Sequence, residues 1–81
     1  MKAEIRFFAS LVEAVGQAAV AMEVDPAQTP SALWAALGRE YPRLAEVGFR
    51  PLVAADLSYV RWDAPIGEAR EIAFLPPLSG G

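Results

Sequence analysis

The last eight residues, FLPPLSGG, combine features that could serve one chemical purpose. From Ile72 to Gly81 no side chain carries a charge, and Pro76-Pro77 stiffens the chain because proline favours the extended polyproline conformation. Gly80 and Gly81 have no side chains, so they could enter a slot too narrow for a Cβ atom. We expect this segment to act as a thin probe with the carboxylate of Gly81 at its tip.

A free carboxylate is a poor acyl donor because its oxygen does not leave. Activation as a mixed anhydride with a nucleotide phosphate would supply a leaving group. A sulfur nucleophile could then displace the nucleotide and leave a terminal thiocarboxylate, which is a transferable sulfur atom held by an acyl group. This chemistry favours a carrier of an activated group over a self-sufficient enzyme.

The rest of the sequence offers little other chemistry. The chain has no Cys and no His, which removes the thiolate nucleophile, the commonest general base and the commonest metal ligand. It has no GxGxxG and no phosphate-binding loop motif. The sequence therefore predicts no catalytic side chain, no metal site and no intrinsically bound cofactor.

Charge and hydropathy exclude two further classes of partner. The net charge is −3, and the 7 basic residues are spread along the chain, so no basic stripe is available for nucleic acid. No apolar run reaches the ~20 residues needed to span a bilayer, and the start does not resemble a cleavable leader. We expect a cytoplasmic protein that binds neither nucleic acid nor membrane.

With 81 residues, the chain can form one domain around one small core. The predicted elements are a strand at 2–8, a short helix at 9–15 with Ser10 as its cap, a strand at 18–24, a main helix at 30–41 capped by Thr29, and strands at 52–55, 58–62 and 71–75. One helix can cover only one face of a sheet, which suits an α+β roll. We therefore predict a β-grasp (ubiquitin-like) roll, a mixed sheet of about five strands with the first and last parallel in the middle. A ferredoxin-like fold ranks behind because it needs a second good helix. The domain should span residues 1–75, followed by a flexible Gly-Gly tail at 76–81.

Three apolar residues, Phe8, Tyr59 and Leu75, stand on strand faces whose other residues are mostly charged. Phe8 and Leu75 would lie at the same end of adjacent parallel strands. This placement predicts an exposed apolar patch beside the root of the tail, suited to docking on a partner. Trp34 and Trp62 are expected in the core.

The two ends of the chain resemble those of a known protein family. The stretches IRFFASLVEAVG at 5–16 and EIAFLPPLSGG at 71–81 resemble the MoaD/ThiS family of ubiquitin-like sulfur carriers, and within it the small subunit of molybdopterin synthase. Members open with a strand ending in paired aromatics, a short helix and Gly, and close with hydrophobic-Pro-Pro-x-x-Gly-Gly. The chain departs from the pattern in the loop at 67–72, at Leu75, where a second aromatic is usual, and at Asp56, where Asn is frequent.

The resemblance implies a defined cycle for molybdenum cofactor biosynthesis. An E1-like adenylating enzyme would use ATP to adenylate Gly81, and a desulfurase or rhodanese would supply the sulfur of the thiocarboxylate. The tail would then insert into the large subunit of molybdopterin synthase, which carries the catalytic residues, within a heterotetramer. There, sulfur from successive carriers would convert cyclic pyranopterin monophosphate (precursor Z) into molybdopterin.

The same resemblance assigns roles to single residues. Gly81 would carry the sulfur, and Gly80 would pass through the slot. The partner-binding residues would be Phe8, Tyr59, Leu75, Pro76, Pro77, Leu78 and Ser79. Three alternatives stay open: a sulfur carrier for thiazole, cysteine or tRNA thiolation, a ubiquitin-like modifier joined to lysines through Gly81, and an interaction module with an inert tail.

Overall fold

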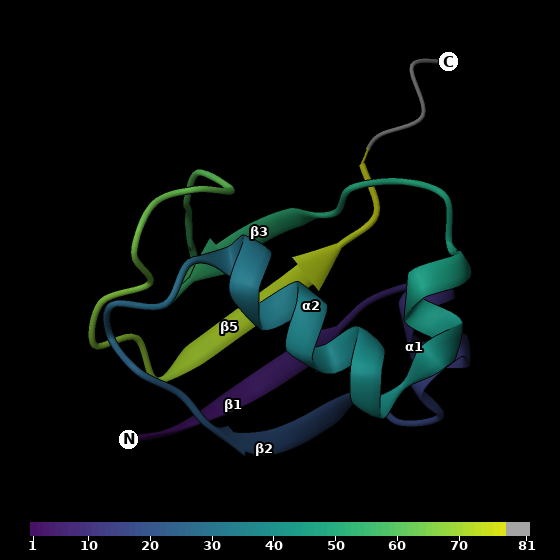
Figure 1. Ribbon diagram of the computed structural model, residues 1–81, viewed down its shortest axis with the longest axis horizontal. Helices are drawn as coiled ribbons and strands as arrows, with labels where there is room; N and C mark the ends of the chain where they lie inside the picture. The colour runs from purple at the N-terminus through teal and green to yellow at the C-terminus, as the bar shows by residue number, and fades with distance from the viewer. Residues whose placement is uncertain (78–81) are drawn as a thin grey trace.

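The computed structural model describes residues 1–77, which form a mixed five-stranded sheet with the strand order β2-β1-β5-β3-β4 (Figure 1). The elements are β1 (Lys2–Phe7), α1 (Ser10–Val15), β2 (Ala19–Glu23), α2 (Pro30–Glu40), the 3-10 helix η1 (Pro42–Glu46), β3 (Leu52–Ala55), β4 (Ser58–Tyr59) and β5 (Glu71–Leu75). β1 and β5 pair in parallel, and the other neighbours pair antiparallel. This is the predicted β-grasp roll, with the first and last strands side by side inside the sheet.

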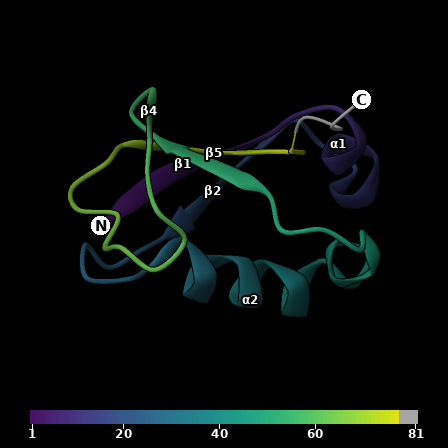
Figure 2. The ribbon, with the colours of Figure 1, turned by 90° about the horizontal axis from the view of Figure 1, so that it is seen from above.

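The main helix α2 crosses one face of the sheet (Figure 2). It begins as predicted, because Thr29 Oγ1 accepts a hydrogen bond from the Ala32 N–H at 3.1 Å and Pro30 occupies the first turn. Leu33 and Leu37, one turn apart, are buried against the sheet. The opposite face of the sheet, which we call the open face, is covered by no helix among residues 1–77.

The core fills the space between α2 and the sheet. The two parallel strands meet there through Phe7 and Phe74, which are partners in register, with ring centroids 6.4 Å apart. Trp34 of α2 reaches the same cluster, 5.2 Å from the Phe74 ring. β5 is thus held by ladders on both edges and by aromatic packing beneath, which fixes where the chain leaves the sheet after Leu75.

Two sequence-based expectations about local structure are wrong. Ser10 does not cap α1: Ala9 holds the N-cap position, with φ of 53°, and no side chain caps the helix. The strand expected at 58–62 is only Ser58–Tyr59. The chain leaves the sheet because Trp62 turns toward α2, where its carbonyl accepts the Ser31 N–H at 3.1 Å and its ring packs edge-on against Trp34. Trp34 and Trp62 are both half-buried.

At 11 residues, α2 is too short to cross a bilayer, and no other helix within residues 1–77 is long and apolar enough to do so.

Candidate functional site

The candidate site begins where β5 ends. Leu75 is the last residue of β5 and pairs with Leu52 of β3. Pro76 is half-buried and Pro77 is exposed, so these two prolines carry the chain away from the sheet. Four of the residues assigned to the site, Leu78, Ser79, Gly80 and Gly81, lie outside the described residues. Their roles, and the boundary at 75/76, stay predictions.

Around this exit lies the apolar patch expected from the sequence. Phe8 directly follows Phe7, and Leu75 directly follows Phe74, so both residues leave adjacent parallel strands at the same end. Phe8 is 41% exposed and Leu75 is half-exposed. The two residues thus place apolar side chains beside the root of the tail.

The patch extends across the open face to the far edge strand. The register aligns Arg6, Ala73, Ala54 and Tyr59 in one row across four strands. Tyr59, 72% exposed, stands beyond the two small alanines. Such a shallow floor with an aromatic at its edge suits contact with a partner protein.

Leu52 belongs to the same patch but was missed from the sequence. It is 40% exposed and pairs with Leu75, whereas Val53 and Ala55 face the core. All four residues of this strand, LVAA, are apolar, so the sequence gives no signal that Leu52 faces outward. We define the docking patch as Phe8, Leu52, Tyr59 and Leu75.

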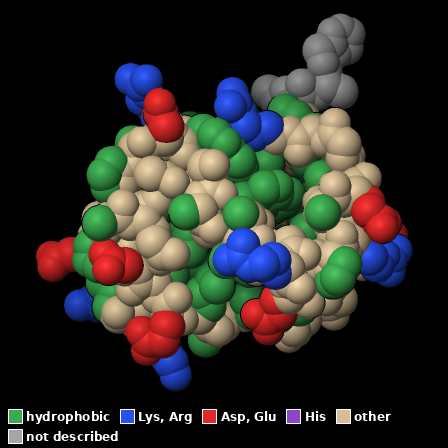
Figure 3. All heavy atoms as spheres, viewed as in Figure 1, with side chains coloured by type: hydrophobic (Ala, Val, Ile, Leu, Met, Phe, Trp, Pro, Cys, Tyr) green, Lys and Arg blue, Asp and Glu red, His purple; other side chains and the backbone are tan. Residues whose placement is uncertain are grey.

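Away from the tail root the open face becomes charged, from Arg6 in the row of Tyr59 to Glu4 and Glu71 beyond it. Arg6 Nη1 lies 3.5 Å from Glu71 Oε1, and Arg6 Nε lies 3.9 Å from Glu4 Oε2. These side chains are partly exposed, so the pairs add little to stability. The open face is therefore polarised, apolar near the tail root and charged at the opposite end. On the α2 side, by contrast, hydrophobic side chains show in separate groups between charged ones (Figure 3).

Asp56 fixes the start of β5, a role that was not expected from the sequence. Its Oδ1 accepts hydrogen bonds from the N–H groups of Arg70 and Glu71, both at 3.0 Å. The turn after β3 is thereby tied to the loop that enters β5. Both ends of the strand that leads to the tail are thus held in place.

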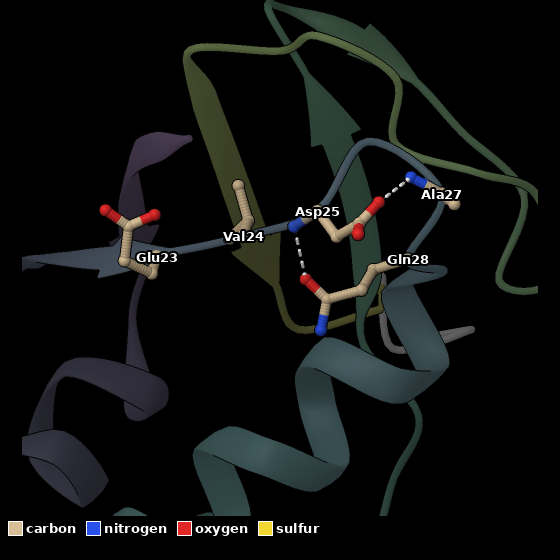
Figure 4. A pocket seen from close by; sticks show the side chains of 5 residues that line it. All are labelled: Glu23, Val24, Asp25, Ala27 and Gln28. Atoms are coloured by element: carbon tan, nitrogen blue, oxygen red, sulfur yellow. Dashed lines mark hydrogen bonds between the residues drawn. The ribbon is translucent and has the colours of Figure 1, made fainter.

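A surface hollow of about 540 Å³ lies where β2 ends and the chain continues toward α2, and not at the tail root (Figure 4). Asp25 Oδ1 accepts the Ala27 N–H at 2.8 Å, and Gln28 Oε1 accepts the Asp25 N–H at 2.7 Å. These two polar side chains thus hold the conformation of the loop that lines the hollow. Within residues 1–77 no group of three or more acidic, His or Cys side chains could hold a metal ion.

Comparison with known proteins adds to this geometry. The model of the ThiS family matches residues 5–81. The chain belongs to the ThiS family. The membership predicted from the two ends of the sequence is therefore confirmed.

Solved structures similar to this ThiS-family protein share its fold. SAMP1, the small archaeal modifier protein 1 of Haloferax volcanii, is 26% identical with a TM-score of 0.80, and the match covers 100% of both chains. A putative molybdopterin converting factor subunit 1 from Pyrococcus furiosus is 16% identical with a TM-score of 0.79, covering 96% of this chain and 99% of that one. A complex of subunits 1 and 2 of molybdopterin-converting factor from Helicobacter pylori contains a chain that is 21% identical, with a TM-score of 0.65 and full coverage of both chains.

Proposed function

We propose that this protein is the sulfur-carrying small subunit of a molybdopterin synthase, and that Gly81 carries the sulfur as a thiocarboxylate. The observation that carries the proposal is a ThiS-family chain whose central strand β5 ends beside an exposed apolar patch and is followed in the sequence by Pro-Pro-x-x-Gly-Gly. The partner binds the folded domain, and the tail presents the reactive group to it. The protein would work in the cytoplasm and hold no cofactor of its own.

The loading chemistry balances without a catalytic side chain on this protein. A carboxylate oxygen of Gly81 attacks the α-phosphate of ATP on an E1-like enzyme, and pyrophosphate leaves. The terminal sulfur of a persulfide, carried by a desulfurase or rhodanese, attacks the acyl-adenylate, and AMP leaves. A thiol then cleaves the acyl disulfide, which forms a protein disulfide and releases the thiocarboxylate.

Delivery requires a partner that holds the domain while the tail reaches a reaction centre. We propose that the large subunit of the synthase docks on the open face through the docking patch, within a heterotetramer. From Pro76 to Gly81 an extended chain spans at most ~20 Å. The centre where cyclic pyranopterin monophosphate receives sulfur must therefore lie within that reach of the patch, and the large subunit must supply the acid–base groups.

Mass spectrometry of the C-terminal fragment tests the loading step. The protein is incubated with the activating enzyme, ATP and a persulfide donor. We expect a gain equal to the replacement of one oxygen by one sulfur, located at Gly81 and dependent on ATP. An unchanged fragment in the presence of an active adenylating enzyme would refute the carrier function.

A second candidate, a ubiquitin-like protein modifier, is favoured by the 26% identity to SAMP1 over the whole of both chains. Adenylation of Gly81 is common to both candidates, but the acyl group would then pass to a lysine amine. In that case the same incubation with a protein extract would yield isopeptide-linked adducts. A carrier for another thiolation pathway would instead load sulfur and fail to support molybdopterin formation with the large subunit.

A further inference from the structure

In the turn between β3 and β4, neither the backbone conformation nor burial in the core explains why residue 57 is a leucine. Ala55 pairs with Ser58, so Asp56 and Leu57 are the central residues of a two-residue turn. Both have positive φ, 47° and 72°, as in a type I′ turn. The second central position of such a turn favours Gly, because a Cβ atom crowds the backbone in the left-handed region.

Burial of the Leu57 side chain does not offset the cost of this strained backbone conformation. Its side chain is 88% exposed, the highest value among the large hydrophobic residues described. Asp56, by contrast, has a structural task, since its Oδ1 accepts the two N–H groups that lead into β5. The turn is therefore fixed by Asp56, and the identity of Leu57 has no explanation within residues 1–77. A strained residue with an unexplained side chain is a reason to look for function.

The position of the hairpin links Leu57 to the open face. β4 rises on the side of the sheet away from α2 (Figure 2). Tyr59, two residues after Leu57, belongs to the docking patch. Because β3 runs from Leu52 to Ala55 against β5, the turn lies at the opposite end of β3 from Leu52 and the tail root. Leu57 thus stands at the end of the open face that is otherwise charged.

We propose that Leu57 is an anchor that enters an apolar pocket of the large subunit, the partner that docks on the open face. The inference rests on the proposed function for the identity of that partner. Continuity with the docking patch supports this occupant, because a body seated on Tyr59 meets Leu57 as well. Anchors at both ends of β3 would fix the orientation of the partner. Only one orientation then directs the tail into the reaction centre. An anchor already held by a rigid turn loses little freedom on binding.

The test measures binding of the purified large subunit from the same organism to the full-length chain by calorimetry. Leu57→Gly and Leu57→Asn suit the left-handed turn but remove the apolar side chain, whereas Leu57→Met keeps an apolar side chain of similar size. We expect Gly and Asn to weaken binding at least tenfold, equivalent to ~1.4 kcal/mol. Met should stay within threefold of wild type. Thermal unfolding should show Leu57→Gly and Leu57→Asn to be no less stable than wild type.

The variant Tyr59→Asp, measured alongside, separates the failure of this inference from the failure of the proposed function. If Tyr59→Asp abolishes binding and both Leu57→Gly and Leu57→Asn bind as wild type does, the anchor is refuted and docking on the open face stands. If wild type does not bind the large subunit, the proposed partner falls and the anchor falls with it. If neither Tyr59→Asp nor the two Leu57 variants change binding, the docking face and the anchor are both refuted. Self-association of wild type that Leu57→Gly removes would assign Leu57 to a contact between copies and overturn the proposal.

Discussion

The substitution Asp56→Ala should destabilise the fold more than its exposed position suggests. It removes one acceptor that serves two backbone N–H groups, of Arg70 and Glu71, each at 3.0 Å. Since water can replace the acceptor at this exposed site, each bond is taken at the lower end of its range, about 0.5–1 kcal/mol. Alanine at φ of 47° adds about 1 kcal/mol of strain that Asp tolerates better. The sum is a loss of about 2–3 kcal/mol.

Thermal and urea unfolding followed by circular dichroism measure this loss. For a domain of this size, 1 kcal/mol corresponds to a shift of roughly 4–8 °C, so the Tm should fall by about 8–24 °C. Asp56→Asn keeps both the oxygen acceptor and the tolerance for positive φ, and it should cost less than about 1 kcal/mol. Asp56→Gly removes the bonds without the strain and should fall between the two. A free energy of unfolding for Asp56→Ala within about 0.5 kcal/mol of wild type would refute the role assigned to this side chain.

Two further substitutions test other parts of the fold. Phe74→Ala empties a fully buried position between Phe7 and Trp34. It should lower the free energy of unfolding in urea by about 3–5 kcal/mol, a large part of the stability of so small a domain. A loss below about 1 kcal/mol would contradict the aromatic packing beneath β5. Thr29→Ala removes the hydrogen-bond acceptor at the start of α2 and should lower the free energy of unfolding by about 1 kcal/mol. Thr29→Ser keeps the hydroxyl and should be near neutral. Equal losses for both variants would show that the hydroxyl does not cap the helix.

The strands that flank the core could be predicted because their two faces differ. In β1, Ala3, Ile5 and Phe7 alternate with polar residues, and each of the three is buried. The strand expected at 58–62 was predicted too long, because the alternation of residue types does not reveal that Trp62 contacts Trp34, a residue distant in the sequence. Trp62 instead leaves the sheet to pack against Trp34 and lies beneath the Arg50 guanidinium, 5.5 Å from its ring centroid.

The docking patch was only partly predictable for a related reason. Phe8 and Tyr59 were recognised because an apolar residue on a polar face is an anomaly. Leu52 lies in the short apolar run LVAA, where the sequence does not say which residues face the core. The hydrogen bonds of Asp56 could not be predicted either, because they join residues that only the folded sheet brings together.

The measurement that tests the central claim most directly follows the sulfur atom itself. The protein is loaded with isotopically labelled sulfur, separated from the loading enzymes, and mixed with the large subunit and cyclic pyranopterin monophosphate. We predict that the label leaves Gly81 and appears in molybdopterin. A chain extended by a few residues beyond Gly81 should neither take up the label nor yield product. Normal molybdopterin formation with the untrimmed extended chain would contradict the account.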